Sequence, residues 1–162
     1  MNLYSEPKPN IEHIRAVAED IAARISREYG ISISAETTDN FSFITLPCRT
    51  EAVIQISDVD SGMLPLQADI FYGGCFQELY SVDYGNDGEF AEAVCGFVKG
   101  FAGRQLKVTV KSKLFGGTET KAEYLEGSQW KPLFEKTDKS FIMRIFTWNS
   151  KTTVSEYDFR LN

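Results

Sequence analysis

Basic side chains are missing from a long stretch of this 162-residue sequence: residues 50–98 contain no lysine, arginine or histidine. The same stretch holds nine carboxylates, whereas residues 1–49 carry five bases and seven acids and residues 99–162 carry twelve bases and seven acids. The net charge of −6 therefore conceals a reversal of sign along the chain. Because the nine carboxylates repel one another, they stabilise the fold only if cations from elsewhere lie beside them.

Long apolar runs and cysteine pairs are also missing. No window approaches the roughly 18 uninterrupted apolar residues of a membrane-spanning helix, and the first residues, MNLYSEPKPNIEHIR, lack the basic and apolar segments of a secretion signal. We therefore expect a cytoplasmic protein with no membrane partner. Cys48, Cys75 and Cys95 form no C-x-x-C pair, which predicts reduced, mostly buried thiols rather than a zinc or redox motif.

The composition is that of a folded globular protein. Hydrophobic residues make up 43% of the chain, charged residues 25% and aromatic residues 13%, which excludes disorder and fibrous repeats. We expect one α+β domain over residues 1–162, with two main helices packed on a mainly antiparallel sheet.

Two segments have the periodicity of amphipathic helices. Apolar side chains recur every three or four positions over residues 11–29 and again over residues 88–102. Asn10 and Gly30 can cap the first helix, and Asp87 can cap the start of the second.

Shorter segments alternate apolar and polar residues, as half-buried strands do. They are ISISAE, FSFITL and AVIQIS after the first helix, LQADIFY before a pair of glycines, and QLKVTVKSKLF after the second helix. TKAEYLEG fits a strand or a helix, and SFIMRIFTW with TVSEYDFRL predicts a closing hairpin around NSK. The predicted order is helix, four strands, helix and further strands.

Catalytic chemistry has few candidates. His13 is the only histidine and lies off the apolar face of its helix, which is typical of a solvated surface residue. Cys75 follows two glycines that could form an anion-binding nest, but a cysteine between aromatic residues is more often part of a core. Asp58 and Asp60 lack the glycine and glutamate positions of an EF-hand loop. We therefore expect no enzyme, no catalytic residue, no metal and no cofactor.

Lysines follow one side of the strand expected at QLKVTVKSKLF, at Lys107, Lys111 and Lys113. Together with Trp130 and Trp148 downstream, such a ridge can bind nucleic acid. Lysines on the outer face of an edge strand also discourage aggregation. Because a chain with a pI near 4.9 repels phosphate over most of its surface, we expect no nucleic-acid partner.

Two explanations fit the acidic stretch. In the first, lysines of the C-terminal third pair with its carboxylates in the fold, and the charge asymmetry cancels in space. In the second, the carboxylates form an exposed surface with interleaved aromatic residues, which anchor a protein partner while the charges steer a basic one. The residues predicted to bind this partner are Asp58, Asp60, Asp69, Tyr72, Phe76, Glu78, Tyr80, Asp83, Tyr84, Asp87 and Glu89.

The segment DIFYGGCFQELYSVDYGNDGEF, in a small acidic α+β chain without a catalytic motif, resembles bacterial immunity proteins in general plan. These are cytoplasmic antidotes to polymorphic or contact-dependent growth inhibition toxins. The resemblance implies one-to-one binding to a secreted toxin domain, often a nuclease, whose active site or substrate channel is blocked. An acidic protein can occupy the cationic groove of such a toxin in place of phosphate.

Two alternatives stay open. One helix followed by three strands is similar to type III secretion chaperones, homodimers that wrap an unfolded effector segment. That family has a further helix where SFIMRIFTWNSKTTVSEYDFRLN here predicts strands. The other alternative is a small enzyme that uses Cys75 or a pair of acidic residues. The sequence does not distinguish between oligomeric states.

Overall fold

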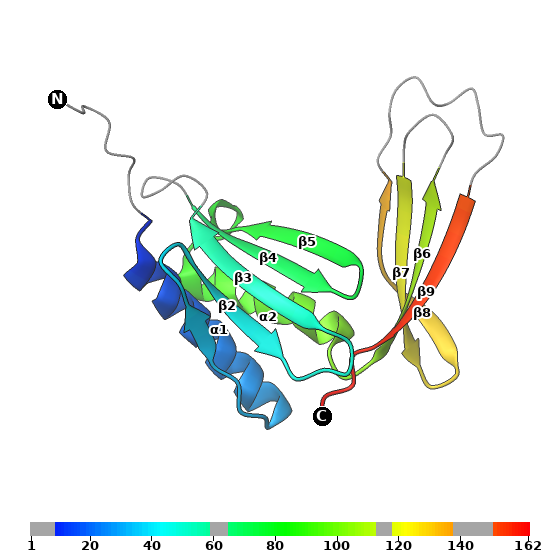
Figure 1. Cartoon of the computed structure of the whole chain (residues 1–162), viewed down its shortest axis with the longest axis horizontal. Helices are drawn as coiled ribbons and strands as arrows, with labels where there is room; N and C mark the ends of the chain where they lie inside the picture. Colours follow the sequence, from blue (N-terminus) through cyan, green and yellow to red (C-terminus); the bar gives the residue numbers. More distant parts are fainter. Residues whose placement is uncertain (1–8, 59–64, 113–117, 138–150) are drawn as a thin grey trace, which may run out of the picture. The chain divides into compact units, whose positions relative to one another are not determined.

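The structure is a computed structural model that describes residues 9–58, 65–112, 118–137 and 151–162 (Figure 1). The chain forms two compact units. Unit 1 consists of Met1–Pro47 and Glu51–Lys99, and unit 2 consists of Cys48–Thr50 and Gly100–Asn162. Each unit is built on an antiparallel sheet of its own.

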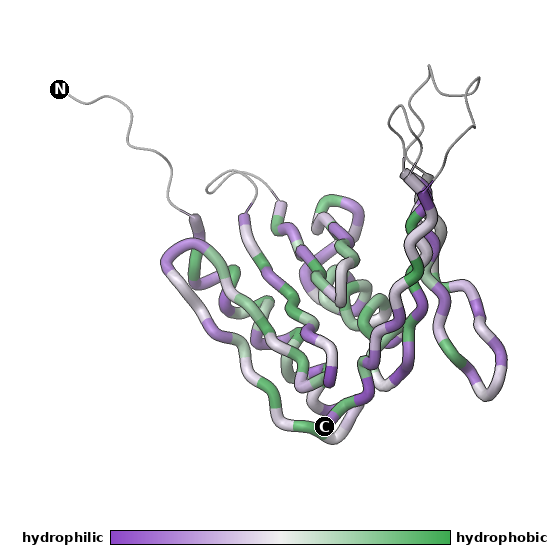
Figure 2. The backbone as a smooth tube through the Cα atoms, turned by 45° about the vertical axis from the view of Figure 1, so that its right-hand side comes forward, coloured by the Kyte–Doolittle hydropathy of each residue, from purple (hydrophilic) through white to green (hydrophobic). Residues whose placement is uncertain are grey.

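Five antiparallel strands form the sheet of unit 1, in the order of the chain. They are β1 (Ala35–Thr37), β2 (Phe41–Leu46), β3 (Ala52–Asp58), β4 (Leu66–Tyr72) and β5 (Cys75–Tyr80). Successive side chains of a strand point to opposite faces, so that hydrophobic and hydrophilic residues are interspersed along the chain (Figure 2). Along β4, every second side chain from Leu66 to Tyr72 is buried. The sheet therefore has one covered and one uncovered face.

Two helices, α1 (Ile11–Tyr29) and α2 (Asp87–Phe101), cover one face of this sheet (Figure 1). The ring of Phe97 on α2 meets the ring of Tyr72 edge to face, with 5.5 Å between centroids. The helices also contact each other, since the Cys95 thiol donates to the Ile21 carbonyl at 3.9 Å. Each large apolar side chain buried between helices and sheet stabilises the fold by about 1.5–3 kcal/mol.

The predicted caps of α1 are confirmed. The Asn10 side chain accepts a hydrogen bond from the His13 N–H at 3.2 Å. Gly30 follows the last turn with φ 64°, a left-handed conformation that favours glycine, and its N–H donates to the Ser26 carbonyl.

The prediction that Asp87 caps α2 is wrong, because Asn86 takes that place. Its side chain accepts from the Glu89 N–H at 3.0 Å, and the Glu89 carboxylate accepts from the Gly85 N–H at 3.0 Å. These bonds satisfy amide groups at the start of α2 and place its cap at Asn86, one residue before the predicted cap.

A two-residue turn joins β4 to β5. Tyr72 pairs with Cys75, which leaves Gly73 and Gly74 as the turn. Gly73 has φ 52°, a conformation that L side chains rarely adopt, so the turn requires glycine there. The glycine pair ends a strand as predicted, but β5 after it was not predicted.

Unit 2 contains a four-stranded sheet in the order β8-β7-β6-β9. Its strands are β6 (Gln105–Ser112), β7 (Thr118–Glu126), β8 (Gln129–Thr137) and β9 (Lys151–Asp158). The alternation predicted for β6 is confirmed, with Leu106 and Val108 buried. TKAEYLEG falls mainly in β7 and is a strand, and β8 was not predicted. β9 pairs with β6, and the first strand of the predicted closing hairpin lies within residues 138–150, outside the described residues.

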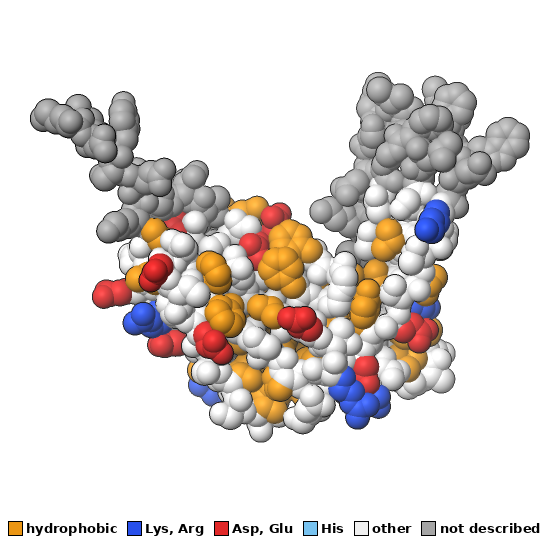
Figure 3. All heavy atoms as spheres, in the orientation of Figure 1, with side chains coloured by type: hydrophobic (Ala, Val, Ile, Leu, Met, Phe, Trp, Pro, Cys, Tyr) orange, Lys and Arg blue, Asp and Glu red, His pale blue; other side chains and the backbone are white. Residues whose placement is uncertain are grey.

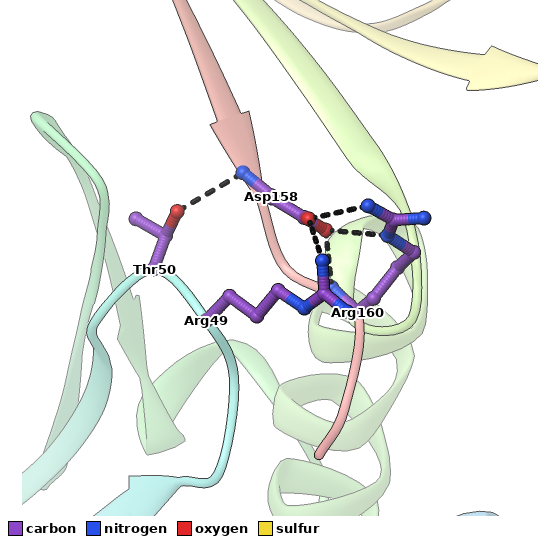
Figure 4. A network of polar contacts seen from close by, with 4 residues as sticks. All are labelled: Arg49, Thr50, Asp158 and Arg160. Atoms are coloured by element: carbon purple, nitrogen blue, oxygen red, sulfur yellow. Dashed lines mark hydrogen bonds and ion pairs between the residues drawn. The ribbon is translucent and has the colours of Figure 1, made fainter.

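One carboxylate joins two segments of unit 2 (Figure 4). Asp158 accepts hydrogen bonds from Arg160 at 2.7 and 2.8 Å and from Arg49 at 3.3 Å. Its N–H donates to the Thr50 hydroxyl at 3.0 Å. The hydrogen bonds from Arg160 are the main reason that the pKa of Asp158 lies well below its usual range. These contacts attach Cys48–Thr50 to the end of β9.

The predicted α+β class, with two main helices and antiparallel strands, is confirmed. The strands divide between two sheets where the sequence predicted one, because β6 pairs with β7 and β9 of its own third of the chain. One domain over residues 1–162 stays a prediction, since two compact units can belong to one folding domain.

Replacing Asn86 with alanine removes the acceptor at the first turn of α2, and we expect the free energy of unfolding to fall by about 1 kcal/mol. Asn86→Ser keeps an acceptor and should cost only about 0.3 kcal/mol or less. Chemical denaturation followed by circular dichroism measures both variants. Equal losses in the two variants would show that the cap does not stabilise the helix.

Candidate protein-binding face

The uncovered face of the unit 1 sheet carries an acid pair next to an aromatic pair. The register of β4 and β5 places Asp69 opposite Glu78 and Phe71 opposite Phe76. The two rings lie 5.0 Å apart between centroids, and Phe71 and Phe76 are 44% and 47% exposed. Tyr80 lies two residues beyond Glu78 on β5 and therefore points to the same face. We call these five residues the acidic-aromatic face.

The neighbouring positions of this face add no positive charge. On the described parts of β2, β3 and β4 they are Phe41, Phe43, Thr45, Val53, Gln55, Ser57 and Gln67. Figure 3 shows apolar and acidic side chains next to one another over unit 1. Such a surface can anchor a partner through the rings and attract a basic partner through the carboxylates.

We expect the acid pair to destabilise the folded chain. Like charges directly opposite each other on neighbouring strands repel. Burial is the main cause that raises the pKa of Asp69, and the charge of Glu78 raises it further. A hydrogen bond of 2.6 Å from the Gln67 side chain acts in the opposite direction. A surface position that costs stability is typical of a functional site.

The structure places four of the predicted partner-binding residues on this face, namely Asp69, Phe76, Glu78 and Tyr80. It also adds Phe71, which was not predicted. The signal was present in LQADIFY, because the alternation that buries Leu66, Ala68 and Ile70 directs Phe71 to the uncovered face.

Other predicted residues lie elsewhere. The prediction that Tyr72 is an exposed anchor is wrong, because its side chain is 1% exposed and packs on Phe97. Asp58 is half-buried at the end of β3, and it pairs with Leu66 on the covered side of the sheet. It therefore does not belong to the acidic-aromatic face. Asp60 lies outside the described residues.

Four predicted residues follow β5 in the chain and are not on the strands. Asp83 is exposed in the 3₁₀ helix η1 (Ser81–Asp83). Tyr84 is half-buried, and its ring packs on the start of α2. Asp87 pairs with His13 on α1 at 2.7 Å, and the Glu89 carboxylate accepts from the Gly85 N–H at the start of α2. Tyr84, Asp87 and Glu89 thus have structural roles within unit 1, and a part for them in binding stays a prediction.

His13 and Cys75 also have structural roles. His13 is exposed on α1 and bonds to Asp87 through Nε2. Cys75 is 8% exposed, and burial raises the pKa of its thiol to about 11, so the thiol stays protonated at neutral pH. The prediction that Cys75 is a buried, unpaired thiol is confirmed. Within the described residues, no group of three or more His, Cys, Asp or Glu side chains is placed to hold a metal ion.

A groove of about 510 Å³ runs along the C-terminal halves of the two helices. Its charged lining residues are Arg24, Arg27, Glu28, Glu92 and Lys99. Arg24 pairs with Asp20 at 2.9 Å, and Lys99 pairs with Glu28 at 3.0 Å. Charges of both signs therefore line the groove, and it does not select a ligand of one charge.

One lysine of the predicted ridge on β6, Lys107, has partners within unit 2, whereas Lys111 is exposed. Lys107 and Lys121 contact Glu123 at 3.1 and 2.8 Å, and the hydrogen bonds from Lys121 and Lys107 lower the pKa of Glu123. Lys107 also lies over the ring of Trp130, 4.5 Å from its centroid. Lys107 is thus held by partners in its own sheet. Lys113 and Trp148 lie outside the described residues.

In the part of the chain that the structure describes, no helix is both long and apolar enough to cross a membrane. Comparisons with protein-family models, with curated proteins and with solved structures yield no match. The function of this chain is therefore inferred from its own residues and geometry.

Asp69→Asn keeps the oxygen that accepts from Gln67 and removes the charge opposite Glu78. Because the folded-state pKa of Asp69 is raised, its ionisation weakens the fold above that pKa and has no effect well below the ordinary aspartate pKa. We expect Asp69→Asn to raise the free energy of unfolding at neutral pH, with a gain that vanishes towards about pH 3. Denaturation at several pH values measures this difference.

Asp39→Asn, in the exposed turn between β1 and β2, is the matched control. It should show no comparable gain at neutral pH. A loss of stability in Asp69→Asn at neutral pH would contradict the conclusion that the acid pair destabilises the fold.

Proposed function

We propose that this chain is a toxin-neutralising immunity protein, which binds a basic toxin domain through the acidic-aromatic face and blocks it. In this role the chain is a cytoplasmic binding protein and not an enzyme, and it needs no cofactor. The partner is a protein with a cationic active site or substrate channel, such as a nuclease.

One observation supports this proposal above all: two carboxylates directly opposite each other lie beside an exposed aromatic pair on an uncovered sheet face. Aromatic side chains at the centre of an interface contribute much of the binding energy. Carboxylates around them raise the association rate with a basic partner and exclude acidic ones. The repulsion between Asp69 and Glu78 is relieved when a partner places a cation beside them.

A nuclease toxin suits this face because its groove already binds phosphates. Carboxylates at fixed positions can replace those phosphates, and binding then competes directly with nucleic acid. The exposed rings of Phe71 and Phe76 add contacts that nucleic-acid phosphates cannot supply.

The similarity to type III secretion chaperones suggests a second kind of partner, an unfolded effector segment. A five-stranded sheet with an uncovered face can also accept an extended segment. The two functions differ in the state of the free partner, which is a folded domain for a toxin and an unfolded segment for an effector.

Co-expression with the product of the neighbouring reading frame tests the proposal, with association and dissociation rates measured for the recovered complex. Phe76→Ala should speed dissociation by the equivalent of about 1–3 kcal/mol, because it removes an anchoring ring. Glu78→Lys should slow association and weaken its dependence on salt, because charges steer the encounter.

Glu19→Lys is the control for the charge reversal, since Glu19 is exposed on α1, on the helix side of the sheet. It should leave both rates nearly unchanged. Equal association rates for Glu78→Lys and Glu19→Lys at low salt would mean that the face does not steer a basic partner. Failure of any neighbouring product to bind would contradict the immunity function.

A further inference from the structure

The free edge of β5 adjoins the acidic-aromatic face. Within the described residues, β5 is the last strand of its sheet and pairs only with β4. The N–H and C=O groups on the other side of an edge strand are available to a strand from another molecule. Phe76, Glu78 and Tyr80, three of the five residues of the face, lie on this edge strand.

The tight turn determines which backbone groups point outwards. In a two-residue hairpin the residues that flank the turn exchange hydrogen bonds, and hydrogen-bonded pairs then alternate with non-hydrogen-bonded pairs along the ladder. Tyr72 and Cys75 flank the turn, so Gln77 and Leu79 also bond to β4. The N–H groups of Phe76, Glu78 and Tyr80 therefore point to the free edge. The Glu78 carbonyl points the same way and accepts a hydrogen bond from the Gln77 side-chain amide at 2.8 Å, which an added strand would replace.

Because of this alternation, the same three residues offer both backbone hydrogen bonds and side-chain contacts to an added strand. A strand that bonds to Phe76, Glu78 and Tyr80 places its own side chains beside theirs on the uncovered face. The residue of the added strand that lies directly opposite Glu78 is then in line, across the strands, with Glu78 and Asp69. A lysine or arginine fits that position, and an apolar or aromatic residue fits the positions beside Phe76 and Tyr80.

From this geometry we infer that the partner adds an extended strand to the edge of β5, with a lysine or arginine beside Glu78 and apolar residues two positions away on either side. The inference rests on the proposed function and goes further, because it names the mode of binding and the sequence pattern of the bound segment. The occupant is a segment of the basic partner, selected by the acid pair of Asp69 and Glu78.

Amide hydrogen exchange, resolved by residue with NMR, tests this mode in the complex with the co-expressed neighbouring product. In the free chain the amides of Phe76, Glu78 and Tyr80 should exchange fast, whereas those of Gln77 and Leu79 should be protected by β4. In the complex the first three should slow by at least about tenfold, while the other two change little.

A pair of variants separates the contribution of the backbone to binding from that of the side chain. Phe76→Ala and Phe76→Pro both remove the aromatic ring, but only proline also removes the backbone N–H of residue 76. This N–H points away from β4, so its loss does not break a hydrogen bond between β5 and β4. Phe76→Pro should bind about fivefold more weakly than Phe76→Ala. Retained protection of the Gln77 and Leu79 amides in the proline variant verifies that β5 still pairs with β4.

The outcomes distinguish this inference from the proposed function. A complex that forms while the amides of Phe76, Glu78 and Tyr80 stay unprotected overturns strand addition and leaves the immunity function standing. Protection of these amides in the free chain that grows with its concentration means that a second copy occupies the edge, which also overturns the inference. If no partner binds, both fail together.

Discussion

The covered face of the unit 1 sheet is the constraint on which the other features depend. Ile54 and Ile70 are opposite each other at the centre of that face and are fully buried. A shift of β4 by one residue would expose its buried side chains and bury Asp69 and Phe71, at a cost of several large apolar groups. The helices that cover this face therefore also determine, through the alternation of the strands, which residues face solvent on the other side.

The uncovered face is consequently both a product of the fold and a cost to it. The apolar rings of Phe71 and Phe76 gain from contact with each other, but the rings stay about half exposed. The acid pair next to them places two like charges directly opposite each other on neighbouring strands. A basic partner would relieve both costs at once, which links the energetics of the fold to the proposed function.

Local patterns in the sequence were sufficient for some elements and insufficient for others. The apolar period of residues 11–29 and the residues Asn10 and Gly30 identify α1 because both signals are local. The strand LQADIFY was also predictable, and its alternation assigns Tyr72 to the core, although composition alone suggested a surface anchor. The strand β5 has a weaker pattern, since Gln77 and Leu79 lie at a sheet edge where burial is incomplete. The pairing of Asp69 with Glu78 depends on the register across the Gly73–Gly74 turn, which becomes visible only once β5 is recognised.

The proposed function requires that a basic partner covers the acidic-aromatic face. Carbodiimide labelling of carboxylates, read by peptide mass spectrometry with and without the partner, measures this directly. Binding should protect Asp69 and Glu78, while Glu12 and Glu19, exposed on α1, are labelled to the same extent in both states. Unchanged labelling of Asp69 and Glu78 in a saturated complex would contradict it.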